Sequence, residues 1–159
     1  MRKLTGFLIA GLVSTGFIGC ATVPDKSELQ RLDRAAFSSK FVGNTYTRST
    51  EYGRWAEFFE TRKTGYGRAW GDWGSQHATS TYTIAADGEW CVQYSGDHEW
   101  STAEHEYCSV AYTDKKGNVY VETTKDTWEP QTEGEIARVT IKNGDEYGLK
   151  EEAGAGDEQ

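Results

Sequence analysis

The sequence is poor in proline and cysteine, has no cluster of basic residues, and has no apolar run as long as a membrane-spanning helix requires. Its 159 residues include 2 prolines, 3 cysteines, 17 lysines and arginines, and 25 aspartates and glutamates, for a formal net charge of −8. A surface that binds nucleic acid neutralises phosphates with clustered Lys and Arg. We therefore expect no nucleic-acid partner.

A complete catalytic motif is also missing. The chain contains no Gly-x-Ser-x-Gly elbow, no Ser-x-x-Lys with partners and no reactive-cysteine motif. Acidic pairs such as Glu57 and Glu60 occur, but chance pairs are expected in so acidic a chain. We therefore expect a protein without enzymatic activity and without a cofactor, and an unrecognised hydrolase, for example a glycosidase, is the weakest alternative.

The chain is instead rich in aromatic residues. It has 6 Trp, 9 Tyr and 6 Phe within a hydrophobic fraction of 36%. Large rings bury enough apolar area to form a core where aliphatic residues are scarce. Because the length suits one domain and no repeat or linker divides the chain, we expect a single globular unit.

The N-terminus has the pattern of a bacterial lipoprotein signal peptide. Two basic residues precede an uncharged apolar run of about 15 residues, Leu4 to Ile18, which is shorter than the roughly 20 residues of a spanning helix. The run ends in Phe17-Ile18-Gly19-Cys20, which resembles the lipobox of bacterial lipoproteins. The resemblance implies that residues 1–19 are removed and that Cys20 is acylated, with palmitate as one acyl chain. An ordinary signal peptide with an incidental cysteine is the alternative.

The lipoprotein interpretation predicts where the mature chain is held. Loss of the two N-terminal basic residues leaves 15 basic against 25 acidic residues, a formal charge of −10. Several acyl chains give stable anchoring, because each buried methylene contributes about 0.8 kcal/mol. By resemblance to lipoproteins of double-membraned bacteria, Ala21 indicates sorting to the outer membrane. We expect residues 20–24 to be a lipidated tether on the outer membrane, facing the periplasm.

The two remaining cysteines predict one disulfide. Cys91 and Cys108 form an even pair in a secreted chain, and two free buried thiols are the alternative. If the two cysteines face each other across a hairpin, Trp90 lies opposite Ser109 and Val92 opposite Tyr107. Alternation alone leaves both faces open, because the opposite face carries Val110 and Tyr112. We favour an inward face made of Trp90, Val92, Tyr94 and Tyr107.

The rest of the mature chain, residues 25–150, reads as one β-rich domain with a short helix at its start. Ser27 and Gln30 have the spacing of a capping box, and apolar residues recur at helical intervals to Phe37, which predicts a helix over 26–37. Alternating apolar residues between turn signals predict strands at 41–49, 54–63, 66–72, 79–86, 89–95, 106–113, 118–125, 135–142 and 145–149. Seven to nine short strands in sequence indicate an antiparallel meander that closes into a β-barrel or folds into a sandwich. The acidic segment 151–159 is expected to be a disordered tail.

One segment combines rings with glycines in a way that suits ligand binding. In the stretch from Gly65 to Gly74, glycines alternate with larger residues, which allows close backbone approach and exposes the rings. The candidate ligand-binding residues are Tyr66, Arg68, Trp70 and Trp73. The alternative is an ordinary barrel strand whose glycines relieve crowding opposite a large core ring.

A second cluster carries metal-binding residue types. Asp97-His98-Glu99 and Glu104-His105-Glu106 both lie between the two cysteines. Imidazole and carboxylate groups are ligands for divalent cations, but no recognised ligand spacing is present and polar hairpin tips are common. We therefore predict no metal site here.

Three short motifs resemble a known family. The segments Phe41-Val42-Gly43-Asn44-Thr45, Asp87-Gly88-Glu89-Trp90-Cys91 and Tyr107-Cys108 resemble a proteobacterial family of small secreted or lipid-anchored proteins that is classed as a domain of unknown function. The resemblance covers about residues 41–123. It implies an envelope location, a β-rich fold and a bridged cysteine pair, together with a loose association with exopolysaccharide production, and it implies no activity.

These observations predict a non-catalytic binding module of the cell envelope. A glycan or another envelope ligand is the leading partner, bound by stacking and apolar burial on aromatic residues. The alternative is an acidic protein-interaction module, such as an inhibitor of a cationic envelope hydrolase, because the negative charge would steer a basic protein towards it.

Overall fold

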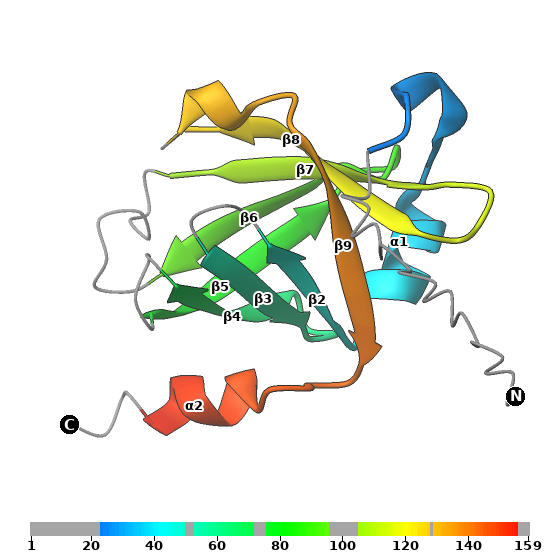
Figure 1. The fold of residues 1–159 in the computed structure, drawn as a ribbon. Coiled ribbons are helices and arrows are strands. Elements are labelled where there is room, and N and C mark those ends of the chain that lie inside the picture. The colour runs from blue at the N-terminus through cyan, green and yellow to red at the C-terminus, as the bar shows by residue number, and fades with distance from the viewer. Residues whose placement is uncertain (1–22, 50–52, 72–75, 96–104, 128, 156–159) are drawn as a thin grey trace, which may run out of the picture.

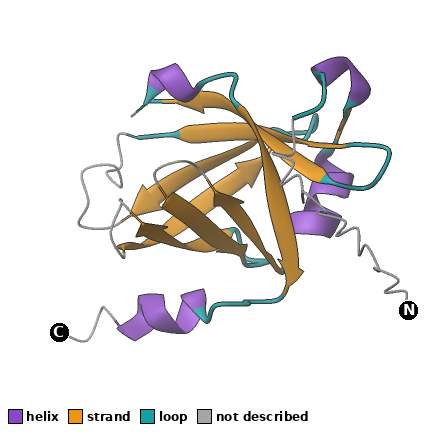
Figure 2. Cartoon of the chain, viewed as in Figure 1, coloured by secondary structure: helices purple, strands orange, loops and turns teal. Residues whose placement is uncertain are grey.

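The structure is a computed structural model that describes residues 23–49, 53–71, 76–95, 105–127 and 129–155 (Figure 1). Within these residues a single sheet contains β1 (Gln30–Arg31), β2 (Asn44–Ser49), β3 (Gly53–Phe59), β4 (Thr64–Gly71), β5 (Gln76–Ile84), β6 (Trp90–Ser95), β7 (Tyr107–Thr113), β8 (Val119–Asp126) and β9 (Ile136–Asn143). The helical elements are η1 (Lys26–Glu28), α1 (Arg34–Phe41), η3 (Pro130–Thr132) and α2 (Leu149–Ala155). Figure 2 shows both α-helices outside the wall of strands.

The sheet closes into an eight-stranded antiparallel barrel. Strands β2 to β9 pair in chain order, and β9 also pairs with β2, so that each of these strands has a neighbour on both sides. The extra strand β1 pairs with β7. The predicted antiparallel meander is confirmed, and the molecule forms the barrel rather than the sandwich. Because the ring is closed, the backbone of each of its strands is paired on both sides, which removes exposed edges.

Glycines occupy the predicted turns, although the turn at Gly144 leads to no further strand. Gly88, Gly117 and Gly144 have φ angles of 84°, 82° and 72°, in the left-handed region that glycine adopts without steric cost. The predicted strands from 41–49 to 135–142 correspond to β2 to β9.

The C-terminal segment differs from both predictions made for it. No strand forms over 145–149, and residues 151–155 belong to α2 rather than to a disordered tail. The carboxylate of Asp145 accepts hydrogen bonds from the backbone N–H groups of Leu149 and Lys150 at 2.8 and 2.9 Å, which starts the helix. Leu149 is 1% exposed, and α2 packs against β3, β4 and β5. The sequence pattern missed this docking because residues 149–155 carry no run of large apolar side chains at helical spacing.

The N-terminal helix is shorter and lies later than predicted. The segment 26–33 forms η1 and β1, and the helix spans Arg34–Phe41. Asp33 is its N-cap, since its carboxylate accepts from the N–H of Ala36 at 2.8 Å, whereas Ser27 bonds to Asp25. The expected capping box is therefore wrong, because Asp25 caps η1 and Asp33 caps α1.

The core is built from aromatic rings at the α1 end of the barrel. Phe37 and Phe41 are fully buried and stack at 4.3 Å between ring centroids. Phe37 lies 4.5 Å from the ring of Trp90, and Phe59 completes the layer. Because Trp90 begins β6 and Phe59 ends β3, these contacts place α1 over one end of the barrel and close it to water.

The predicted disulfide hairpin is confirmed. Cys91 pairs with Cys108 across β6 and β7 and is bonded to it, with Trp90 opposite Ser109 and Val92 opposite Tyr107. Trp90, Val92 and Tyr94 are buried in the core, and Tyr107 packs on Tyr94 with ring centroids 5.3 Å apart. The inner face of the hairpin is the predicted one.

Candidate functional site

The aromatic and glycine residues of β4 divide between the two faces of the barrel wall. Gly65, Gly67 and Ala69 point inward, and the predicted ligand-binding residues Tyr66, Arg68 and Trp70 point outward. Trp73 lies outside the described residues. A Cβ at Gly67 would lie 2.2 Å from Cζ2 of Trp55, and one at Gly65 would lie 2.3 Å from Oγ of Ser80. These glycines therefore make room for core side chains, as the alternative interpretation of the segment predicted.

On the outer face, the predicted residues contact the C-terminal segment of the same chain. Arg68 donates two hydrogen bonds of 2.8 Å to the carboxylate of Glu152 in α2. The guanidinium groups of Arg54 and Arg68 lie 4.4 and 5.0 Å from the ring centroid of Trp70, and the ring of Tyr147 meets Trp70 edge-on at 5.5 Å. A sugar that stacked on Trp70 would have to displace one of these groups, so this face is partly occupied by intramolecular contacts.

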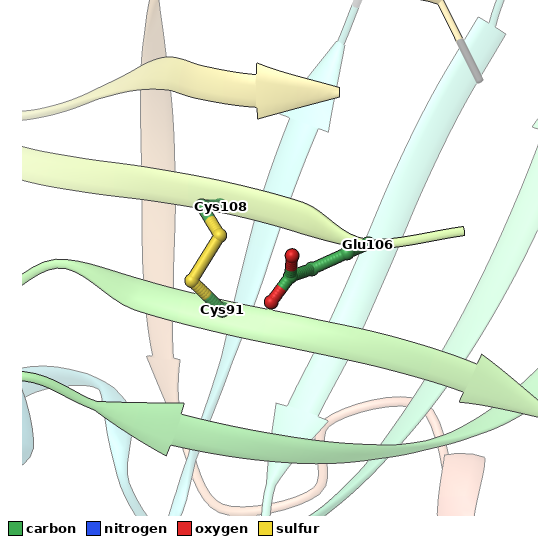
Figure 3. A group of neighbouring side chains, drawn as sticks. All are labelled: Cys91, Glu106 and Cys108. Carbon is green, nitrogen blue, oxygen red and sulfur yellow. A yellow bond between two sulfur atoms is a disulfide. The ribbon is translucent and has the colours of Figure 1, made fainter. Parts of the chain in front are cut away.

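The predicted cluster between the cysteines has only its last part in the described residues. Asp97, His98, Glu99 and Glu104 lie outside them. Glu106 lies beside Cys91 and Cys108 and could complete a set of three metal-ligand types (Figure 3). Both sulfur atoms are joined in the disulfide, however, and the carboxylate of Glu106 pairs with Lys125. These three residues therefore serve as a covalent and ionic brace rather than as ligands.

Inside the barrel, a carboxyl group lies in the core. Glu57 is fully buried, between Trp55 and Phe59 on the inward face of β3. Its Oε1 accepts a hydrogen bond from Ser80 Oγ at 2.9 Å, and its Oε2 accepts one from Tyr94 OH at 2.9 Å. Tyr46 OH and Trp55 Nε1 approach Oε2 at 3.4 Å. We refer to Glu57 and these four donors as the Glu57 cluster.

The electrostatics of the Glu57 cluster follow from burial. Desolvation raises the pKa of Glu57, and the hydrogen bonds from Ser80, Tyr94 and Trp55 oppose that rise in part. Desolvation together with the nearby Glu57 charge also raises the pKa of Tyr94 well above its ordinary value. Within the described residues no Lys or Arg forms an ion pair with Glu57. Burial therefore shifts this carboxyl group towards its neutral form, whereas its four uncharged donors favour the ionised form.

The structure separates Glu57 and Glu60, the acidic pair noted in the sequence. Glu60 follows the last residue of β3 and forms an ion pair with Lys150. Glu57 points into the core. The burial of Glu57 could have been found from the period-2 pattern Trp55-x-Glu57-x-Phe59, which places it on the same face as two rings. Because the two carboxyl groups occupy separate environments, they do not form a general acid and base pair.

The described surface contains a groove at the α1 end of the barrel. It has a volume of about 460 Å³, within the range of ligand-binding pockets. Its walls are the last turn of α1, the β7–β8 turn and β9, which lies beside α1 in Figure 1. The lining residues are Ser39, Lys40, Asn44, Gly117, Asn118, Val119, Arg138, Val139, Thr140, Ile141 and Asn143. We call this hollow the α1 groove.

Hydrogen bonds hold the polar side chains of the α1 groove in place. The Asn44 side chain donates to the carbonyl of Lys40 at 2.8 Å and accepts from the N–H of Gly144 at 3.2 Å, and so ties α1 to the start of β2. Asn118 donates to Asp114 at 2.6 Å and accepts from Arg138 Nη2 at 2.6 Å. The groove is thus a preorganised surface.

Sequence reasoning did not nominate the α1 groove. Asn44 belongs to the Gly-Asn-Thr motif that supported the family resemblance, but one of its partners, Gly144, lies in a segment 100 residues away. Barrel closure brings these segments together, and no local pattern encodes that closure.

Comparison of the chain with protein-family models, with curated proteins and with solved structures gives no match. The resemblance to the proteobacterial family, the lipobox and acylation of Cys20 therefore stay predictions, and residues 1–22 lie outside the described residues. Within the described part of the chain, no helix has the length and apolar character of a membrane span.

Proposed function

We propose that this protein is a non-catalytic cell-envelope lipoprotein that binds a glycan in the α1 groove. The observation that carries the proposal is the groove itself, because it combines amide and hydroxyl groups with a partly exposed apolar side chain. Asn143 and Thr140 offer hydrogen-bonding groups to sugar hydroxyls, and Ile141 offers apolar surface to the C–H face of a ring. The lipid anchor is inferred from the lipobox at Cys20, and it would hold the barrel at the outer membrane.

Binding is tested with the acylated protein in detergent micelles, after removal of residues 1–19. Isothermal titration calorimetry against envelope polysaccharide fragments should give saturable binding, which Ile141→Asp and Asn143→Ala should weaken. Trp70→Ala is the matched control, because Trp70 lies on the outer face of β4, where the sequence had predicted the site. Binding that is lost in Trp70→Ala and retained in the groove variants would return the site to the outer face.

The anchor has a separate test. Cells that express the full chain are labelled with radioactive palmitate, and the label should appear on the native protein and be absent from Cys20→Ser. A labelled Cys20→Ser protein would contradict the lipoprotein assignment.

The net charge favours a second candidate, an acidic module that inhibits a cationic envelope hydrolase. The processed chain has 15 basic against 25 acidic residues, and its formal charge of −10 would speed association with a basic protein. Titration with a basic lysozyme distinguishes the two candidates, since such binding should weaken as salt rises and should not depend on Ile141 or Asn143.

A further inference from the structure

We infer that the α1 groove selects an anionic glycan, one whose sugars carry carboxylate or phosphate groups. This inference rests on the proposed function and names the ligand class for the same site. It begins from the charges of the lining. The groove has two cationic residues, Lys40 and Arg138, and no acidic residue among those that line it, in a chain with 25 acidic residues.

The two cations of the groove differ from the lysines that form ion pairs in β8 and β9. Lys125 pairs with Glu106, and Lys142 pairs with Glu146. Within the described residues, neither Lys40 nor Arg138 lies within ion-pair distance of a carboxylate. Their charges therefore remain available to a bound anion.

Arg138 is also oriented for recognition. Its Nη2 donates to Oδ1 of Asn118 at 2.6 Å, and Asn118 in turn donates to Oδ2 of Asp114 at 2.6 Å. The hydrogen bond from Asn118 lowers the pKa of Asp114, which keeps that carboxylate ionised as an acceptor. These two hydrogen bonds hold one edge of the Arg138 guanidinium. Its other N–H groups are left for an incoming carboxylate or phosphate.

The groove is larger than a single inorganic anion requires. Its volume of about 460 Å³ leaves room beside a lone phosphate, and the partly exposed side chain of Ile141 offers such an ion no hydrogen bond. The uncharged hydrogen-bonding groups of Asn143 and Thr140 suit hydroxyls beside the charged group. A sugar that carries an anionic substituent uses all three kinds of surface.

The inference is tested with oligosaccharide pairs that differ only in charge. One pair is hexagalacturonate and its fully methyl-esterified form, and the other is a phosphorylated mannan oligosaccharide and its dephosphorylated form. We expect the processed full chain in detergent micelles to bind at least one anionic member about tenfold more tightly than its neutral counterpart. This preference should shrink as sodium chloride rises from about 50 mM to about 500 mM. The pair that shows the preference identifies carboxylate or phosphate as the recognised group.

Charge-removing variants locate the preference. Lys40→Gln and Arg138→Gln should each lower the ratio of anionic to neutral affinity by about three- to tenfold. Lys125→Gln is the matched control, because it removes one positive charge from the far end of β8 and should leave the ratio unchanged. Near-ultraviolet circular dichroism checks that each variant retains the packing of its aromatic core.

The outcomes separate the inference from the proposed function. Equal binding of both members of each pair, weakened by Ile141→Asp and unaffected by Arg138→Gln, would overturn the anionic preference and keep the glycan-binding groove. A preference that survives in both Gln variants would overturn the assignment to Lys40 and Arg138. Failure of the native protein to bind any of the four oligosaccharides would overturn the inference and count against the proposed function, which the broader panel of envelope polysaccharides then decides.

Discussion

The inner and outer faces around β4 carry similar kinds of groups in opposite settings. Inside, Glu57 is fully buried and its hydrogen bonds come from uncharged side chains. Outside, Arg68 and Glu152 form a charged pair whose side chains are 24% and 40% exposed. Water can replace a lost partner outside but not inside. The comparison teaches that polar contacts of similar length contribute unequally, and that the inner cluster controls stability.

Removal of the inner carboxyl should have the largest effect. Glu57→Ala leaves the donors of Ser80 and Tyr94 unsatisfied in the core and opens a cavity, so we expect a loss of about 3–5 kcal/mol in the free energy of unfolding. Urea denaturation followed by Trp fluorescence measures it. Glu60→Ala is the matched control, since Glu60 forms only an exposed ion pair with Lys150. Equal losses in the two variants would remove the distinction between the faces.

The glycines of the inner face provide the next largest effect. A Cβ at residue 67 would overlap the six-membered ring of Trp55, so Gly67→Ala should destabilise the protein by about 1–3 kcal/mol. Trp55→Phe removes the indole atoms that the new methyl group would meet. The double variant should therefore lose less than the sum of the two single variants, and simple additivity would show that crowding is not the cause.

Much of the barrel could be predicted from sequence, because strand patterning and turn glycines are local signals. The register of Cys91 and Cys108 came from two cysteines in one hairpin. The predicted position of the N-terminal helix was wrong. Asp25 and Asp33 are the N-caps of η1 and α1, in place of the predicted cap Ser27. The burial of Glu57 was missed although the alternation of Trp55, Glu57 and Phe59 along one strand indicates it. The α1 groove was missed for another reason. It depends on which strands close the barrel, and an amide or basic residue has the same identity in the sequence whether it is buried, paired or free.

The pH dependence of the free energy of unfolding should test the buried carboxyl group of the inner face, with a variant that keeps its shape. Burial raises the pKa of Glu57 above its ordinary value, so the folded state keeps this proton to higher pH than the unfolded state does. The contribution of Glu57 to stability is therefore fully present below the unfolded pKa and is lost as pH rises through the folded pKa. Glu57→Gln keeps the shape and removes the titration. The difference in unfolding free energy between native protein and Glu57→Gln should shift in favour of the variant as pH rises from about 4 to about 8. A pH-independent difference would contradict a raised pKa.

The outer pair should give the smallest effect. Arg68 and Glu152 make two hydrogen bonds of 2.8 Å, but both side chains are partly solvated, so water compensates when either is removed. A double-mutant cycle of Arg68→Ala and Glu152→Ala should give a coupling energy below about 1 kcal/mol that falls as salt rises. A coupling as large as the loss in Glu57→Ala would mean that α2 shields this pair from water as fully as the barrel shields its core. The outer face would then contribute to stability in the same way as the inner one, since what separates them is access of water and not the number of hydrogen bonds.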